Sequence, residues 1–275
     1  LLDLQAADWG DIAALVLSPG VPLTHPAPHW TVEKAKAAGV EIIGDIELFA
    51  RAVNAAPAHK RPKVATITGT NGKSTTTALL GHLCRTAGRD TRVGGNIGAG
   101  VLGLDDMHGG AVYVLELSSY QLDLTSTLKP DVAVLLNITP DHLDRYPSMR
   151  AYQAAKMNIF QNQDDTDWAI ANESCAGFLR ETLEKRKINT IYFNKDRSGL
   201  ARLFMEEGTL YINLHNRCET VCRRDEVKLF GDHNLENIFS GIAAAAICGV
   251  PTAGIAEALK SFKAVSHRLE YIDTV

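Results

Sequence analysis

Short apolar runs alternate with helical patterns in the first part of the chain. Residues 12–17 form a continuous apolar run that ends at Ser18-Pro19-Gly20, which predicts a buried strand followed by a turn. A helical pattern over residues 31–38 and a short apolar stretch over residues 40–43 come next. Together they predict an α/β unit of roughly 55 residues, which is too small for a complete doubly wound domain.

The pattern in the middle of the chain predicts a linker, a strand, a loop and a helix. The segment from Asn54 to Pro62 is rich in alanine, proline and histidine and lacks a period, which predicts a linker. Lys63–Thr68 then predicts a strand, Gly69–Ser74 a glycine-rich loop, and the apolar positions that follow predict a helix that ends near Gly88.

Near-continuous apolar runs at residues 111–117 and 132–136 are typical of parallel strands that are covered on both faces. A helix is expected over residues 149–161 and a further strand over residues 168–171. Residues 188–230 hold shorter, more alternating segments, which predict a small and largely antiparallel sheet.

Two helical patterns, at residues 234–248 and 252–262, close the sequence pattern. We therefore expect an α/β fold with a central, mostly parallel sheet and a small antiparallel subsheet, preceded by a partial α/β N-terminal domain. The expected limits are residues 1–58 for the first domain, residues 59–266 for the central domain, and residues 267–275 for a stub.

Composition narrows the class of protein. The chain has 275 residues, 45% of them hydrophobic and 22% charged, which suits a globular protein of roughly two domains. Its formal net charge of −4 offers no basic excess for nucleic acid, and no apolar run is long enough to span a membrane. The five cysteines are scattered, and Cys218 and Cys222 lack a second pair at zinc-finger spacing, so we expect reduced thiols.

The loop between the predicted strand and helix carries the chemistry of phosphate binding. Its glycines let several backbone N–H groups face one anion, and the helix that follows adds its positive N-terminal end. Lys73 suits the β- and γ-phosphates, and the Ser74 hydroxyl suits Mg²⁺. Ile67 occupies the position of the first glycine in the usual P-loop pattern, so a glycine-rich turn that holds a lysine by chance is the alternative.

The segment Thr68–Thr75, which reads TGTNGKST, resembles the ATP loop of Mur ligases and their folylpolyglutamate synthase relatives. Three later stretches, Gly94–Gly98, Leu115–Leu122 and Asn137–Tyr146, have the order and spacing of the D-glutamate-adding branch of that family. Asp45–Phe49 fits the same branch, so the resemblance covers essentially the whole chain.

The resemblance implies an activity in peptidoglycan synthesis in the cytoplasm. ATP, with two Mg²⁺ ions, would phosphorylate the terminal carboxylate of UDP-N-acetylmuramoyl-L-alanine, and the amine of D-glutamate would then attack the acyl phosphate. A monomer with small-molecule partners is expected. The alternatives are another Mur ligase, a folylpolyglutamate synthase-like enzyme, and a non-catalytic nucleotide-binding fragment.

The family also implies a uridine-binding first domain and a C-terminal domain that helps to close the ATP site. Here the chain opens at Leu1 and extends only a few residues beyond His267-Arg268. We therefore expect the first domain to be partial and the last to be missing. A chain without the closing domain should be inactive or only weakly active.

Residue roles follow from the resemblance and from position in the predicted sheet. Glu116 ends one strand and His142 follows the next, so both should reach the carboxyl edge where α/β folds bind ligands. The expected catalytic residues are Lys73, Glu116, His142 and Lys156, and the expected metal ligands are Ser74, Glu116, His142 and Lys156. Residues expected at the nucleotide are Gly69, Thr70, Asn71, Gly72, Lys73, Ser74, Thr75, Asn234 and Arg268.

Several of these residues have plainer interpretations. Composition alone favours an exposed, solvated Lys156, whereas the resemblance implies a lysine carbamylated by CO₂ that binds the second metal. Asn234 could instead be a helix cap, and Arg268 a surface arginine. For the UDP-linked substrate, the resemblance implies contacts with Ser18, Pro19, Gly20, Asn96 and His142.

Overall fold

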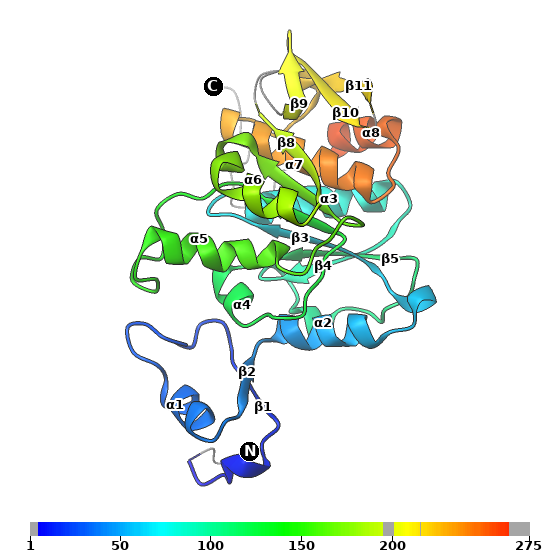
Figure 1. The fold of residues 1–275 in the computed structure, drawn as a ribbon. Helices are drawn as coiled ribbons and strands as arrows, with labels where there is room; N and C mark the ends of the chain where they lie inside the picture. Colours follow the sequence, from blue (N-terminus) through cyan, green and yellow to red (C-terminus); the bar gives the residue numbers. More distant parts are fainter. Residues whose placement is uncertain (1–4, 195–200, 215, 264–275) are drawn as a thin grey trace, which may run out of the picture.

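The N-terminal unit is small and irregular. The computed structural model describes residues 5–194, 201–214 and 216–263. In its first part, β1 (Ala14–Val16) and β2 (Glu41–Ile43) pair in parallel, and α1 (Trp30–Ala37) connects them. This unit lies at the foot of the molecule, below the large sheet (Figure 1). The predicted strand–turn–helix–strand order is confirmed.

In the described part of the chain, a nine-stranded sheet forms the body of the molecule, with strand order β11-β10-β9-β8-β7-β6-β3-β5-β4. The neighbouring strands along the part of the sheet that runs from β4 through β5, β3, β6, β7 and β8 to β9 pair in parallel. Strand β10 pairs antiparallel with both β9 and β11. The strands are β3 (Lys63–Thr68), β4 (Asp90–Gly95), β5 (Ala111–Glu116), β6 (Val132–Leu135), β7 (Trp168–Asn172), β8 (Asn189–Phe193), β9 (Ala201–Glu206), β10 (Thr209–Leu214) and β11 (Arg217–Arg223).

The antiparallel strands extend the parallel sheet and do not form a sheet of their own, which corrects one detail of the prediction. Ile191 lies on β8, which pairs in parallel with β7, although its segment was expected in the antiparallel part. The reason is that β9 pairs with β8, so the parallel and the antiparallel strands belong to one continuous sheet. The predicted mostly parallel α/β fold is otherwise confirmed.

Helices cover both faces of this sheet (Figure 1). One face packs against α3 (Lys73–Thr86), α7 (Asp232–Ile247) and α8 (Thr252–Ser261), and the other against α2 (Asp45–Ala55), α4 (Ser119–Asp123) and α6 (Ala176–Lys185). Helix α5 (Met149–Met157) packs beside α4. Short 3₁₀ helices are η1 (Trp9–Asp11), η2 (Ala58–Lys60), η3 (Val101–Gly103), η4 (Asn158–Phe160), η5 (Glu173–Cys175) and η6 (Arg224–Glu226).

Burial on both faces explains the near-continuous apolar strands. Along β3, Ala65 and Ile67 belong to the core on the α3–α7 side, whereas Val64 belongs to the core on the α2–α6 side. Successive side chains of a strand point to opposite faces, so a strand covered on both sides needs an apolar residue at every position. Because β3 pairs in parallel with both β5 and β6, the carboxyl ends of these three strands lie at the same edge of the sheet.

Helix α2 was not predicted, and it occupies the start of the expected linker. It runs to Ala55, and only the residues after it connect to β3. Its Phe49 ring lies 5.1 Å from the ring of Tyr113 in the core of the sheet. The buried Glu47 carboxylate accepts hydrogen bonds from the backbone N–H groups of Ser126 (2.8 Å) and Thr127 (2.9 Å). Helix α2 thus packs with the central sheet, while the domain limits themselves stay a prediction.

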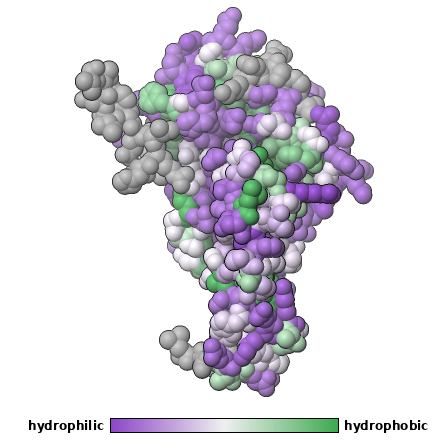
Figure 2. Space-filling model, turned by 90° about the vertical axis from the view of Figure 1, so that its left-hand side faces the viewer, coloured by the Kyte–Doolittle hydropathy of each residue, from purple (hydrophilic) through white to green (hydrophobic). Residues whose placement is uncertain are grey.

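The face of the described residues that Figure 2 shows is mainly hydrophilic, with small scattered apolar patches, and the N-terminal unit forms the narrow lower part of this view. Among the described residues, no helix is both long and apolar enough to cross a membrane. All five cysteines are free thiols, with Cys218 exposed and Cys222 buried.

Candidate functional site

The glycine-rich loop joins β3 to α3 at the carboxyl edge of the sheet. Gly72 occupies the N-cap position of α3 with a φ of 85°, and no side chain of the described residues caps the helix there. The first backbone N–H groups of a helix lack partners within the helix, so an uncapped N-terminus attracts an anion. The loop and helix therefore form a site suited to phosphate.

Gly72 is required by both its conformation and its surroundings. A Cβ atom at this position would lie 2.2 Å from Oδ1 of Asn237, which accepts a hydrogen bond from the Thr76 hydroxyl. We expect Gly72→Ala to lower the free energy of unfolding by about 2 kcal/mol, because a left-handed alanine is strained and Asn237 must move. Affinity for ADP should fall roughly tenfold.

Chemical denaturation and calorimetric titration with ADP measure these two effects. Gly177→Ala is the matched control, because a Cβ there meets nothing within 4 Å and the residue lies in α6. Equal stability of the Gly72 and Gly177 variants would contradict the steric argument.

Asn137, which follows β6, holds the loop in shape. Its Oδ1 accepts from the backbone N–H of Asn71 at 2.9 Å, and its Nδ2 donates to the Asn71 carbonyl at 3.2 Å. The backbone carbonyl of Asn137 accepts from the Thr70 N–H at 2.9 Å. Asn137 was not predicted as a site residue, although an asparagine directly after a strand that ends at this edge was a usable indication.

Two lysines meet at the same loop carbonyl. Nζ of Lys73 donates to the carbonyls of Gly69 (3.1 Å) and Thr70 (2.9 Å), and Nζ of Lys156 donates to the carbonyl of Gly69 at 2.8 Å. Lys156 is only 1% exposed, so the interpretation as a solvated lysine is wrong. The reason is that the helix of Lys156 packs against the loop, and Tyr152 and Ala155 on the same helix are buried as well.

Burial, together with the nearby charge of Lys73, lowers the pKa of Lys156 to about 7, while Asp141 and Glu116 act in the opposite direction. Desolvation disfavours the charged form of an amine, so a substantial neutral fraction exists near neutral pH. A neutral amine is the nucleophilic form of lysine. The environment therefore fits the carbamylation implied by the resemblance.

Glu116, the last residue of β5, offers an oxygen suited to a cation. The residue is 2% exposed, and its Oε1 accepts from Nδ2 of Asn96 at 3.0 Å. Its Oε2 is buried and has no hydrogen-bond partner among the described residues. A buried carboxylate oxygen without a donor is costly, and Mg²⁺ prefers oxygen ligands. Ser74, buried in the first turn of α3, belongs to the same edge.

His142 joins this edge through a group of aromatic rings. Its Nδ1 lies 3.1 Å from the hydroxyl of Tyr120, and its ring centroid lies 5.9 Å from that of Tyr152. The Tyr152 hydroxyl lies 3.2 Å from Oγ1 of Thr70 in the loop, and Nζ of Lys156 lies 4.9 Å from the Tyr152 ring centroid. These contacts form a continuous path from His142 to the loop.

The structure thus brings Lys73, Glu116 and Lys156 together and links His142 to them. No group of three or more His, Cys, Asp or Glu side chains with metal-binding geometry occurs in the part of the chain that the structure describes. A magnesium site here would consequently combine Glu116 with Ser74 and the oxygens of a bound phosphate, and Lys156 could bind a metal only as a carbamate, which supplies oxygen ligands.

The remaining predicted residues fall in three places. Asn234 is not a helix cap, because α7 begins at Asp232. Its side chain donates to the Phe230 carbonyl at 2.6 Å and accepts from Asn237 at 2.8 Å, which places it beside the loop. Ser18-Pro19-Gly20 forms a turn after β1, closed by the Val21 N–H on the Ser18 carbonyl at 2.9 Å. Arg268 lies outside the described residues.

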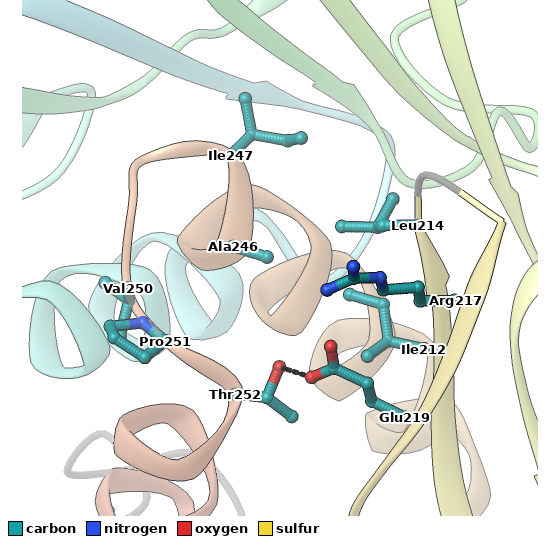
Figure 3. Close-up of a pocket in the computed structure, with 9 residues that line it drawn as sticks. All are labelled: Ile212, Leu214, Arg217, Glu219, Ala246, Ile247, Val250, Pro251 and Thr252. Carbon is teal, nitrogen blue, oxygen red and sulfur yellow. Dashed lines mark hydrogen bonds between the residues drawn. The ribbon is translucent and has the colours of Figure 1, made fainter.

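A cavity of about 550 Å³ lies far from this edge, between β10, β11 and the junction of α7 with α8 (Figure 3). Ile212, Leu214 and Ile247 contribute apolar walls, and Thr252 donates a hydrogen bond to Glu219 at 2.5 Å. None of the predicted site residues lines it.

Comparison with protein families gives a match that covers most of the candidate site. The profile of the Mur ligase middle domain matches residues 67–245, which include the loop, Glu116, His142 and Lys156. Comparison with solved structures supports the fold. The chain has a TM-score of 0.67 and 18% identity to UDP-N-acetylmuramoyl-L-alanyl-D-glutamate--2,6-diaminopimelate ligase, covering 96% of this chain and 65% of that one. For the MurF ligase of Thermotoga maritima in complex with ADP, the TM-score is 0.60 at 18% identity, with 97% and 70% covered.

Curated relatives are much closer in sequence. The UDP-N-acetylmuramoylalanine--D-glutamate ligase of Caulobacter vibrioides is 56% identical over 279 residues, which cover 100% of this chain and 59% of that protein. The ligase of the same name from Phenylobacterium zucineum is 54% identical over 276 residues, which cover 99% of this chain and 59% of that protein. The chain therefore spans about 59% of the length of these relatives.

Proposed function

This chain belongs to the Mur ligase family, and from that premise we propose that it acts in the ATP-dependent addition of D-glutamate to UDP-N-acetylmuramoyl-L-alanine in peptidoglycan synthesis. The observation that carries the ATP chemistry is the buried Oε2 of Glu116, which no group of the described residues pairs, beside the phosphate loop and two lysines. The choice of D-glutamate rests on the 56% identity to the Caulobacter vibrioides ligase.

The residues at this edge suit phosphoryl transfer, which needs positioning and charge neutralisation more than a protein nucleophile. The first turn of α3 and the ammonium group of Lys73 would bind the phosphates of ATP. Two unit charges ~4 Å apart interact by about 1 kcal/mol in water but about 4 kcal/mol at an effective dielectric near 20. Burial of Lys156 and Glu116 therefore strengthens each charge contact at this edge.

Glu116 and Ser74 would hold one Mg²⁺ ion, which would neutralise charge on the phosphates. A carbamylated Lys156 and His142 would supply ligands for a second. Asn96 and the Ser18-Pro19-Gly20 turn would bind the UDP-linked substrate, with Asn96 already fixed by its bond to Glu116. The proposal places the protein in the cytoplasm, where ATP and the UDP-linked substrate are available, as a monomer that binds small molecules.

A chimera tests the proposed reaction at full enzyme length. The 275 residues replace the corresponding part of the Caulobacter vibrioides ligase, and ATP, Mg²⁺ and UDP-N-acetylmuramoyl-L-alanine are supplied with D-glutamate, L-glutamate, meso-diaminopimelate or a glutamyl-folate. We expect a ligated product with D-glutamate alone, and none in the Lys73→Ala chimera. Product with another acceptor and not with D-glutamate would contradict the proposed substrate, and ATP binding without any product would favour a non-catalytic module.

A further inference from the structure

Arg145 is a buried cation whose hydrogen bonds reach into the N-terminal unit. It is 9% exposed and lies just beyond His142, whose carbonyl accepts from the Arg145 backbone N–H at 2.9 Å. Its Nη1 donates to the carbonyl of His25 at 3.1 Å and its Nη2 to the carbonyl of Val21 at 3.3 Å. A rigid guanidinium fork can hold two carbonyls at once, which the single ammonium group of a lysine does less well.

The two carbonyls belong to an irregular segment. Residues 17–29 connect β1 to α1 without a helix or strand of their own, and Val21 directly follows the Ser18-Pro19-Gly20 turn. Its N–H closes that turn on the Ser18 carbonyl. Segments with few internal hydrogen bonds open easily unless another element ties them down. Arg145 supplies such a tie from the central part of the molecule.

The other side of Arg145 faces the candidate metal residue. The centre of its guanidinium group lies 5.1 Å from the ring centroid of Tyr120, and the hydroxyl of that tyrosine lies 3.1 Å from Nδ1 of His142. A histidine that binds a metal through one ring nitrogen is oriented by the partner of the other nitrogen. The same small network thus contacts the N-terminal segment at one end and His142 at the other.

We propose that Arg145 is a positioning residue. Its hydrogen bonds fix the position of the Ser18-Pro19-Gly20 turn relative to His142. A UDP-linked substrate bound at the turn would then place its carboxylate at the sheet edge that carries the phosphate loop. The inference rests on the proposed function for the identity of that substrate. The contacts of Arg145 with residues 21 and 25 stand without it.

Amide hydrogen exchange on the full 275-residue chain tests, without any ligand, whether the hydrogen bonds of Arg145 stabilise the segment between β1 and α1. We expect Arg145→Ala to raise exchange at the backbone amides of Val21 and His29 about tenfold and to leave the amide of Thr76, in α3, unchanged. Arg145→Lys should give a smaller rise. Arg150→Ala is the matched control, since Arg150 is an exposed arginine on α5. Unchanged exchange at Val21 and His29, or an equal rise at Thr76, would overturn the proposal.

Two substitutions of Tyr120 separate stacking from hydrogen bonding. Tyr120→Phe keeps the ring under the guanidinium, so exchange at Val21 should stay as in the unsubstituted chain. Tyr120→Leu removes the ring and should raise that exchange severalfold. The same rise in both variants would show that the ring does not support Arg145.

Calorimetric binding of two ligands tests the role in substrate positioning. In the full-length chimera that carries Arg145→Ala we expect the Kd for UDP-N-acetylmuramoyl-L-alanine to rise about tenfold, relative to the unsubstituted chimera, and the Kd for ADP to change less than twofold. An unchanged Kd for the UDP-linked compound, or an equal loss for both ligands, would refute the positioning role. An unsubstituted chimera that binds ADP but not the UDP-linked compound would count against the proposed substrate, whereas amide exchange decides the role of Arg145 in either case.

Discussion

Replacing Lys156 by methionine is expected to raise the free energy of unfolding by about 3 kcal/mol at pH 7. The pKa of this lysine falls from 10.5 to about 7 in the folded chain, which corresponds to roughly 4–5 kcal/mol of disfavoured charge. Methionine has a similar volume and no charge to bury. The variant loses the hydrogen bond from Lys156 to the Gly69 carbonyl, which lowers the expected increase in the free energy of unfolding. Lys73 still donates to that carbonyl.

The gain should depend on pH in a defined direction. Between pH 7 and pH 10.5 the unfolded chain holds a proton on Lys156 that the folded chain has released, so the stability of the unsubstituted chain falls as the pH decreases through this window. The methionine variant lacks this dependence. The difference between the two should therefore be largest at and below pH 7 and should vanish near pH 10.5.

Urea denaturation at several pH values in CO₂-free buffer measures the effect, because carbamylation would change the charge of Lys156. Lys36→Met, at an exposed position of α1, is the control and should change stability by less than about 0.5 kcal/mol. In the chimera the methionine variant should lose ligase activity. A variant that is less stable at pH 7 than the unsubstituted chain would contradict the interpretation that the site retains a destabilising lysine for its chemistry.

Replacing Glu116 by glutamine should weaken Mg²⁺-dependent ATP binding at least about 100-fold. The substitution keeps the shape of the side chain and an oxygen for the Asn96 amide, but it removes the negative charge and replaces Oε2, which has no partner in the described part of the chain, by an NH₂ group. Mg²⁺ binds carboxylates in preference to amides, so the metal-dependent part of the affinity should be lost. Binding of ADP without Mg²⁺ should change less than threefold, because the loop and Lys73 are unaltered.

Titration calorimetry with and without Mg²⁺ separates these two parts. Glu181→Gln, at an exposed position of α6, is the control for loss of one negative charge. If Glu116→Gln weakens ADP binding equally in the presence and absence of Mg²⁺, Glu116 shapes the loop and is not a metal ligand.

Much of the fold could be predicted because strands buried on both faces leave a continuous apolar pattern. The run at residues 111–117 became β5, and the glycine-rich loop lies between β3 and α3 as expected. Helix α2 was missed even though Ile46, Phe49 and Ala50 have helical spacing, because the proline- and alanine-rich stretch that follows them is typical of a linker.

The gathering of side chains at the edge could be predicted in part. Parallel strands present their carboxyl ends together, so the positions of Glu116 and the loop followed from the pattern of strands. The burial of Lys156 could not be predicted from composition, because it depends on how α5 packs against a loop more than 80 residues earlier, as the bond to Gly69 at a separation of 87 residues shows. The role of Asn137 in holding Asn71 depends on the same kind of long-range contact.

A crystal structure of the chain with Mn²⁺ and a non-hydrolysable ATP analogue tests the central claim most directly. The account predicts phosphates along residues 69–75 and an anomalous manganese peak about 2.0–2.2 Å from Oε2 of Glu116, with Lys73 moved from the loop carbonyls to the phosphates. Phosphates bound elsewhere, or a metal peak that Glu116 does not contact, would contradict it.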